Sequence, residues 1–282
     1  MNQRMDVRTL PDRKSTASMN TQELRGAFVA GELFAPGEVR MVYCDADRAI
    51  IGGAVPGGSP LPLEATRKEM AAEYFTERRE IGIVNIGGGT GTVRAGGTDF
   101  AVRPKDMLYI GRGTRSIEFA GAPASGRPVF YFVSFPAHAE YPAALMRYED
   151  AEKSAIGSPG GASRRTIHRF IHPNGIRSCQ LVMGLTELEA GSVWNTMPPH
   201  THQRRMEVYL YYAMEPGSVV VHLMGEPVET RSLILRDREA VISPAWSIHC
   251  GAATSRYSFI WAMGGENQEF GDMDGVKLED LR

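Results

Sequence analysis

The sequence is poor in cysteine and lacks long apolar runs. Its three cysteines, Cys44, Cys179 and Cys250, are odd in number and widely spaced, unlike the paired framework of a small secreted domain. No apolar run approaches the roughly 20 residues that span a bilayer, and the first 15 residues are polar, without the apolar core of a signal peptide. These absences favour a soluble cytoplasmic protein with reduced thiols.

The sequence also has no excess of positive charge. It contains 31 Lys and Arg against 33 Asp and Glu, a formal net charge of -2. Such a protein has no global positive field to attract phosphate backbones or anionic lipid. We therefore expect no nucleic acid and no membrane among its partners.

Short strand-like runs dominate what is present. Segments such as VRMVYC, PVFYFVSF and MEVYLYY are rich in β-branched and aromatic residues, and most runs close at Gly, Pro or Asp. These turn-forming residues recur roughly every eight to twelve residues, a spacing that is typical of sandwiches and barrels rather than of βαβ units. The predicted fold class is mainly β, with a few short helices.

Two segments read as helices. Residues 20–31 begin with Asn20 or Thr21 as a possible N-cap and reach Gly31, a residue type that often stops a helix. Residues 61–80 (LPLEATRKEMAAEYFTERRE) read as one helix, with Leu63, Met70 and Phe75 among its buried positions.

The chain is long enough for two domains, each with its own core, because 43% of its 282 residues are apolar. Residues 150–165 are small, polar and glycine-rich, which favours a linker or a long surface loop. Both flanking halves are strand-rich, which suggests two similar barrels that arose by duplication. We expect an N-terminal domain over residues 1–155 and a C-terminal one over 156–282, with the acidic tail packed over a barrel mouth or a neighbouring subunit.

One constellation in the second half predicts a metal site. His200 and His202 are two residues apart, so in a strand both imidazoles point to the same face. Glu207 follows a charged bend, and His249 comes after a Ser-Pro turn. Three imidazoles and one carboxylate suit Zn, Mn, Fe, Co or Ni, and differ from the cysteine-rich set of a structural zinc site.

Other residues near this pattern have two readings each. Arg204 and Arg205 could form a solvated face or could clamp a substrate carboxylate. Tyr209 and Tyr211 share the strand parity of Glu207, which directs them inward, either as core residues or as weak catalytic candidates. A lone H-x-H pair often arises by chance, and it is Glu207 and His249 that favour the metal reading. The remaining histidines, which lack partners at ligand spacing, are read as surface or core residues: His138, His168, His172 and His222.

The ligand pattern resembles that of the cupin superfamily, and longer segments resemble one family within it. DRAIIGGAVP, YFTERREIGIVNIGG and SPAWSIHCGAATSRYSFIWAMGGEN, together with the segment around the H-x-H pair, are similar to 5-keto-4-deoxyuronate isomerases. The similarity extends over nearly the whole chain. It implies a bicupin fold, an N-terminal barrel without metal, and a homohexamer with one Zn²⁺ per subunit held by His200, His202, Glu207 and His249.

The resemblance also implies an activity. These enzymes of pectin and uronate degradation interconvert 5-dehydro-4-deoxy-D-glucuronate and 3-deoxy-D-glycero-2,5-hexodiulosonate, a metal-assisted aldose-ketose isomerisation. The sequence does not select the proton carrier: a water activated by the metal, a Glu, a Tyr or a direct hydride shift all remain open. A metal-dependent cupin oxidoreductase or dioxygenase and a non-catalytic sugar-binding bicupin are the alternative functions. Against the non-catalytic alternative, the charged QRR stretch beside an open metal site fits an anionic substrate better.

Overall fold

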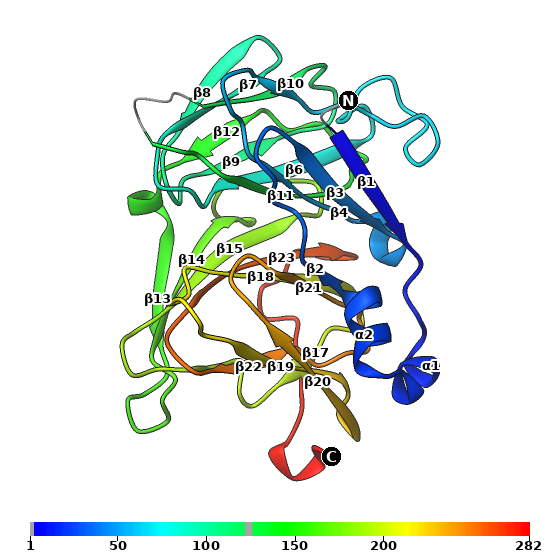
Figure 1. The fold of residues 1–282 in the computed structure, drawn as a ribbon, viewed down its shortest axis with the longest axis vertical. Coiled ribbons are helices and arrows are strands. Elements are labelled where there is room, and N and C mark those ends of the chain that lie inside the picture. The colour runs from blue at the N-terminus through cyan, green and yellow to red at the C-terminus, as the bar shows by residue number, and fades with distance from the viewer. Residues whose placement is uncertain (1–2, 122–125) are drawn as a thin grey trace. The chain divides into compact units, whose positions relative to one another are not determined.

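The computed structural model describes residues 3–121 and 126–282, and their contacts divide the chain into two compact units. The first unit contains the chain up to Arg8, Glu32–Glu152 and Phe170–Val182. The second contains Thr9–Gly31, Lys153–Arg169 and Met183–Arg282. Strands are the main secondary structure of both units and helices are few and short (Figure 1), so the prediction of a mainly β fold is confirmed.

The first unit contains two sheets. The larger has seven strands in the order β1-β3-β4-β11-β6-β9-β12, and the smaller has four in the order β5-β10-β7-β8. The strands of the larger sheet are β1 (Gln3–Arg8), β3 (Val39–Cys44), β4 (Ile50–Ala54), β6 (Arg79–Asn85), β9 (Met107–Ile110), β11 (Phe130–Pro136) and β12 (Ala144–Met146). Those of the smaller sheet are β5 (Leu61–Pro62), β7 (Gly91–Ala95), β8 (Thr98–Val102) and β10 (Ile117–Gly121).

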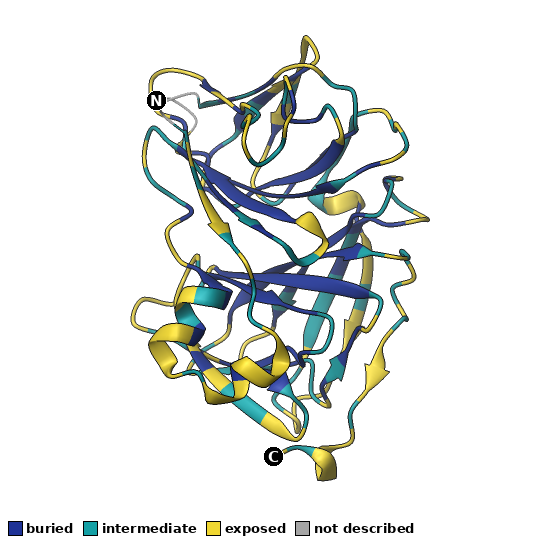
Figure 2. Ribbon diagram, turned by 90° about the vertical axis from the view of Figure 1, so that its right-hand side faces the viewer, coloured by how far each residue is buried: buried dark blue, intermediate teal, exposed yellow. Residues whose placement is uncertain are grey.

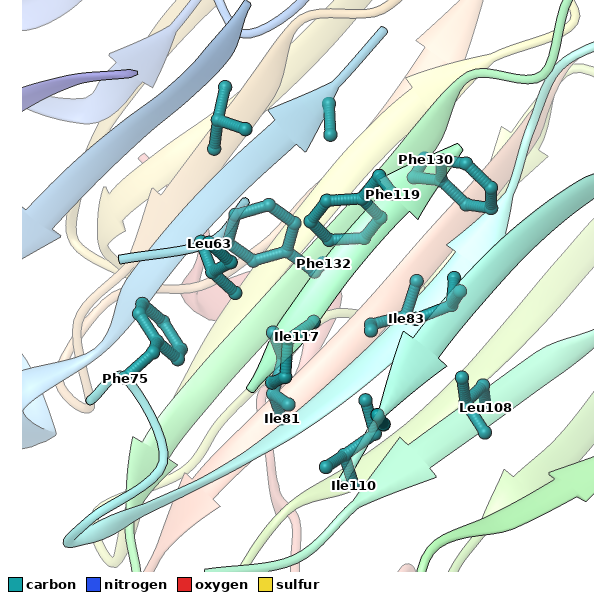
Figure 3. Packing of buried hydrophobic residues seen from close by; sticks show 14 of the residues in the cluster. Leu63, Phe75, Ile81, Ile83, Leu108, Ile110, Ile117, Phe119, Phe130 and Phe132 are labelled. Carbon is teal, nitrogen blue, oxygen red and sulfur yellow. The ribbon is translucent and has the colours of Figure 1, made fainter. Parts of the chain in front are cut away.

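A core of apolar side chains from both sheets fills this unit (Figure 3). Its members recur at every second position of a strand, as in Ile81 and Ile83 of β6, because alternate residues of a strand share a face. The ring of Phe132 stacks on Phe119 at 5.8 Å between centroids and meets Phe75 edge-on at 6.3 Å. Burial of these rings stabilises the unit through the hydrophobic effect and aromatic packing.

The second unit repeats this plan. A seven-stranded sheet runs β13-β14-β15-β23-β18-β21-β2, a four-stranded sheet runs β16-β22-β19-β20, and β17 pairs with β24. The strands of the larger sheet are β2 (Val29–Ala30), β13 (Glu152–Ile156), β14 (Arg165–Ile171), β15 (Val182–Leu188), β18 (Arg205–Tyr212), β21 (Ala240–Ser243) and β23 (Ser258–Gly265). The others are β16 (Trp194–Asn195), β17 (His200–Thr201), β19 (Val220–Glu226), β20 (Glu229–Leu235), β22 (Cys250–Ala253) and β24 (Asp274–Gly275).

The short helices lie outside the sheets. In α2 (Thr21–Phe28), the Asn20 side chain accepts hydrogen bonds from the N–H groups of the first turn, and the Glu23 carboxylate accepts one from the Asn20 N–H, which confirms Asn20 as the N-cap. The predicted end at Gly31 is wrong, because the next residues pair with β21 as strand β2. Within the described residues, the remaining helices are α1 (Arg13–Ser18), η1 (Ala46–Arg48), η3 (Tyr148–Asp150) and η4 (Leu278–Asp280).

The predicted helix over residues 61–80 is wrong. The segment contains the two-residue strand β5 and then a series of turns, and Ala71 has a left-handed φ of 49° that no α-helix accommodates. Leu63 and Phe75 are nevertheless buried against the first unit's core, and Met70 packs partly against it. Contacts with the sheets therefore override the helical propensity of this alanine- and glutamate-rich stretch.

The predicted linker over residues 150–165 is partly strand. Residues 152–156 form β13 at the edge of the second unit's larger sheet, and this strand is mostly exposed, as is the connection over residues 157–161. Figure 2 shows burial across the chain, with buried positions concentrated in the other strands and exposed ones in helices and connections. Within the described residues, no helix is long and apolar enough to cross a membrane.

Candidate metal centre

Four side chains converge in the second unit, as the sequence pattern predicts. Nε2 of His200 lies 3.1 Å from Nε2 of His202 and 3.0 Å from Nε2 of His249. Oε2 of Glu207 lies 3.1 Å from Nε2 of His202 and 2.8 Å from Nε2 of His249. One potential ligand atom from each of the four residues falls within 4.8 Å of the others.

Local structure explains how these atoms meet. His200 is in β17, His202 follows it, and His249 directly precedes β22. Glu207 is in β18, which pairs with β23 on one side and with β21 on the other, so its position is fixed from both sides. The imidazoles of His202 and His249 and the carboxylate of Glu207 are almost fully buried.

Hydrogen bonds on the far side of two rings set their tautomers. Nδ1 of His202 lies 2.7 Å from the carbonyl oxygen of Asp272, and Nδ1 of His249 lies 3.4 Å from that of Ser247. A carbonyl oxygen only accepts, so in the neutral form of each ring the proton is on Nδ1 and Nε2 presents a lone pair to the group.

The donor set fits a cation. Lone pairs and a carboxylate that face one another at 2.8 to 3.1 Å repel unless a positive charge lies among them. Imidazole nitrogen and carboxylate oxygen are ligands of divalent transition metals, which they bind at roughly 2.0–2.2 Å. The four residues could therefore hold one divalent metal ion.

The protonation states agree with this fit. Burial, and then the neighbouring His249, lower the pKa of His200 to about 3, so the ring is neutral. Burial opposes ionisation of Glu207, but the imidazoles of His249 and His202 outweigh it and hold the pKa of Glu207 well below its usual range. Neutral imidazoles and an ionised carboxylate are the forms that bind metal.

The two arginines after the H-x-H pair hold the C-terminal tail. Arg205 is buried, and its Nη1 and Nη2 donate to the carbonyl oxygens of Glu269 and Asp272, each at 2.7 Å. Arg204 forms ion pairs with the carboxylates of Asp272 and Asp274. Neither guanidinium lines the cavity described next.

A cavity of about 280 Å³ opens beside the donor group. Its apolar walls come mainly from β23 and the tail, and include Phe259, Trp261 and Phe270. Its polar lining, apart from the metal donors, consists of Arg165, Thr186, Asn195, Thr196 and Tyr209. Such an apolar pocket with a few convergent polar groups is typical of a small-molecule site.

Tyr209 is the candidate tyrosine that faces this cavity. Its ring stands perpendicular to the His249 ring at 5.4 Å between centroids, and its hydroxyl lies 3.3 Å from Oγ1 of Thr196. Nδ2 of Asn195 donates to that same Oγ1 at 2.6 Å. Burial, and then the nearby carboxylate of Glu207, raise the pKa of Tyr209 well above its usual value, so the phenol stays protonated.

Tyr211 faces a different environment. Its hydroxyl is 2.8 Å from Nδ1 of His222, a fully buried ring in β19. Burial, and then the nearby His249, lower the pKa of His222 to about 3. Tyr211 does not line the cavity, so within the described residues it has a packing role behind the site.

Four polar cavity residues were not singled out from the sequence: Arg165, Thr186, Asn195 and Thr196. Asn195 and Thr196 stand just before the MPPHTH segment, and this closeness to the H-x-H pair could have identified them. Arg165 begins a strand far upstream and carries no local motif, so only the fold could bring it to the cavity.

Comparison with solved structures defines the class. An IolB-like protein from Salmonella typhimurium LT2 superposes with a TM-score of 0.66 at 15% identity, covering 81% of this chain and 87% of that one. Oxalate decarboxylase from Lactobacillus farciminis, solved with formate, gives 0.57 at 9% identity, covering 85% and 83%. At these identities the likeness concerns the fold, which is of the cupin type.

Sequence comparison narrows the class to a family. The chain belongs to the KduI/IolB family, whose family model matches residues 29–278. A relative from Opitutus terrae is 50% identical over 278 residues, 99% of this chain and 100% of its own, and one from Lachnoclostridium phytofermentans is 49% identical with the same coverage. Both are named 4-deoxy-L-threo-5-hexosulose-uronate ketol-isomerase, which confirms the resemblance and the prediction of an isomerase.

Proposed function

We propose that the chain interconverts 5-dehydro-4-deoxy-D-glucuronate and 3-deoxy-D-glycero-2,5-hexodiulosonate with one Zn²⁺ held by His200, His202, Glu207 and His249. The observation that carries this proposal is the convergence of the four ligand atoms at the wall of a cavity with few polar groups. The names of relatives that are about half identical over the whole chain support the choice of substrate.

The reaction moves a carbonyl from C1 to C2 of a sugar acid, with no net redox change. Its barrier is the removal of a weakly acidic C–H hydrogen beside the carbonyl, which places negative charge on oxygen. When bound, a divalent metal would supply a Lewis acid that stabilises this charge. The task of the chain is to orient the substrate and to provide hydrogen bonds to its oxygens.

Tyr209 provides one of these hydrogen bonds. The Asn195 amide donates to Thr196, whose hydroxyl proton can then point to the Tyr209 oxygen. This order leaves the Tyr209 proton free for an oxygen of the substrate. Because its pKa is raised, Tyr209 acts as a donor to the developing oxyanion rather than as a base.

The apolar wall around the donors excludes water. Phe259, Trp261 and Phe270 leave few competing hydrogen-bond partners in the cavity. Trp261 is itself held in place by a hydrogen bond from Nε1 to Oγ1 of Thr186 at 3.2 Å. In such surroundings a hydrogen bond to a charged oxygen is stronger than in bulk water.

Further parts of the proposal rest on the composition of the sequence and on the family resemblance. We propose a cytoplasmic homohexamer and two cupin domains, over residues 1–155 and 156–282, with the metal in the second. The division by contacts assigns Thr9–Gly31 to the second unit and Phe170–Val182 to the first. The proposed boundary therefore marks where the chain passes from one barrel to the other, and one segment on each side of it belongs to the other unit. Native mass measurement tests the hexamer.

The decisive experiment is an isomerase assay with the unsaturated uronate that pectate lyase and oligogalacturonide lyase release. We expect turnover by the purified protein, loss of turnover with a chelator and recovery with Zn²⁺. Turnover that survives complete metal removal, or no turnover with one zinc bound per subunit, would contradict the proposal. Deuterium incorporation from solvent at the product carbon distinguishes proton exchange from hydride transfer, which retains the substrate hydrogen.

A further inference from the structure

Arg165 is a cation without a counter-ion in the proposed substrate cavity. It is the first residue of β14, it is half-buried, and it lines the same cavity as His200, His202 and Glu207. Its Nη1 donates to the carbonyl oxygen of Ser163 at 2.7 Å. Its Nε is buried without a hydrogen-bond partner, and no carboxylate among the described residues lies within ion-pair distance of the guanidinium.

The free edge of this guanidinium is the one that this protein uses elsewhere to bind carboxylates. Arg94 donates to the two oxygens of Asp99 through Nε at 2.7 Å and Nη2 at 3.1 Å. Arg204 likewise turns its Nε and Nη2 to Asp272. In Arg165 the single hydrogen bond occupies Nη1, so Nε and Nη2 have no partner among the described residues and can donate together to a carboxylate.

The charged groups that line the cavity also favour an anionic ligand. Apart from the imidazoles, the charged residues of its lining are Arg165 and Glu207, and the Glu207 carboxylate is engaged by two imidazoles. Burial lowers the pKa of Arg165, yet a guanidinium remains charged at neutral pH. A partly desolvated charge without a partner is costly, so its retention in a ligand cavity indicates a ligand of opposite charge.

We propose that Arg165 binds the carboxylate of the substrate and thereby sets its direction in the cavity. This inference rests on the proposed function, because it takes the substrate to be a uronate. In an open-chain uronate the carboxylate at C6 and the reacting carbons C1 and C2 stand at opposite ends. With C6 at Arg165, the reacting end is directed to the metal donors and Tyr209, which line the same cavity.

The test uses Arg165→Met, Arg165→Lys and a matched control, Arg164→Met. Arg164 is the exposed neighbour, paired with Glu189 at 3.3 Å, and does not line the cavity. For Arg165→Met we expect the KM of the uronate to rise roughly 10- to 100-fold, because loss of a charge-assisted bidentate contact weakens binding by about this factor. The change in kcat should be smaller, and the metal content should be unchanged. Arg165→Lys retains the charge but not the bidentate edge, so its KM should lie between those of Arg165→Met and the wild type. The KM of Arg164→Met should equal that of the wild type.

A binding measurement separates this inference from the proposed function. D-Gluconate and D-glucitol share one skeleton but differ in the carboxylate, and neither has a carbonyl to isomerise. We expect the wild type and Arg164→Met to bind gluconate at least about tenfold more tightly, and Arg165→Met to lose this preference. Equal binding of both compounds by the wild type, or a preference that survives in Arg165→Met, would overturn the assignment even if the protein is an active isomerase. Absence of isomerase activity would instead refute the proposed function, and the gluconate preference would still decide the role of Arg165.

Discussion

Replacement of Tyr209 by Phe removes one hydroxyl from the wall of the proposed active site. The ring is buried, and its contacts with His249 and with Phe259, at 5.4 and 4.7 Å between centroids, are made by atoms that Phe also has. The fold and the donor group should therefore persist. What changes is the donor at the end of the Asn195 and Thr196 hydrogen-bond chain.

The size of the effect follows from the charge on the acceptor. A hydrogen bond to a neutral oxygen contributes about 0.5–1.5 kcal/mol, and one to a charged group about 1.5–3 kcal/mol. Only the increase that accompanies the negative charge in the transition state accelerates the reaction. The difference between these two ranges, roughly 1 to 2.5 kcal/mol, corresponds to a roughly 5- to 70-fold fall in kcat, with KM changed little.

Tyr211→Phe is the matched control, because its hydroxyl contacts His222 and not the cavity. Steady-state kinetics on metal-loaded protein, with metal content measured for each variant, should show a large loss of kcat for Tyr209→Phe alone. If Tyr209→Phe keeps kcat within about threefold of the wild type, or if both variants lose activity equally at full metal content, the role of Tyr209 as the oxyanion donor is refuted.

Three more predictions follow from the same structure. His200→Ala and His249→Ala should each lower metal affinity at least roughly 100-fold and reduce zinc content and activity together, and a normal zinc content by elemental analysis in either variant would exclude that residue as a ligand. His222, whose pKa is about 3 when folded and about 6.5 when unfolded, takes up its proton only on unfolding, so it costs about 2 kcal/mol of stability as pH falls from about 7.5 to about 5. In His222→Gln this part of the pH dependence of stability should vanish, whereas His138→Gln, at an exposed position, should behave as the wild type. The free energy of unfolding is measured by urea denaturation of the metal-free protein. Tryptophan fluorescence reports on the second unit, because all three tryptophans lie there. Phe132→Ala should cost about 3–5 kcal/mol, because the ring is fully buried between aromatic partners, and a loss below about 1 kcal/mol would contradict the packing in Figure 3.

Features with a short period were predictable from the sequence. The alternation of apolar residues, as in Ile81 and Ile83 or Phe130 and Phe132, is a property of neighbouring positions, and it was enough to predict a mainly β chain. His200 and His202 depend on the same two-residue period. Glu207 lies only five positions beyond His202, so a single bend suffices to bring it back.

Features that depend on distant parts of the chain were not predictable. The stretch around Ala71 has the composition of a helix, but Leu63 and Phe75 gain more by packing on the sheets from irregular backbone than a marginal helix gains from its own hydrogen bonds. Arg165 reaches the cavity because β14 is placed in the sheet by its neighbours, and its own sequence context does not indicate this.

The C-terminal tail connects the predictable part of the site, the H-x-H pair, with distant parts of the chain that the sequence does not indicate. The carbonyl of Asp272 accepts from Nδ1 of His202 and from Arg205, so a segment far downstream sets the tautomer of a proposed ligand. The same segment engages the guanidinium of Arg204 through two carboxylates. Once both arginines beside the H-x-H pair hold the tail, neither has a free bidentate edge in the cavity for an anionic substrate. Arg165 has such an edge, so recognition of the carboxylate should be separable by mutation from retention of the metal.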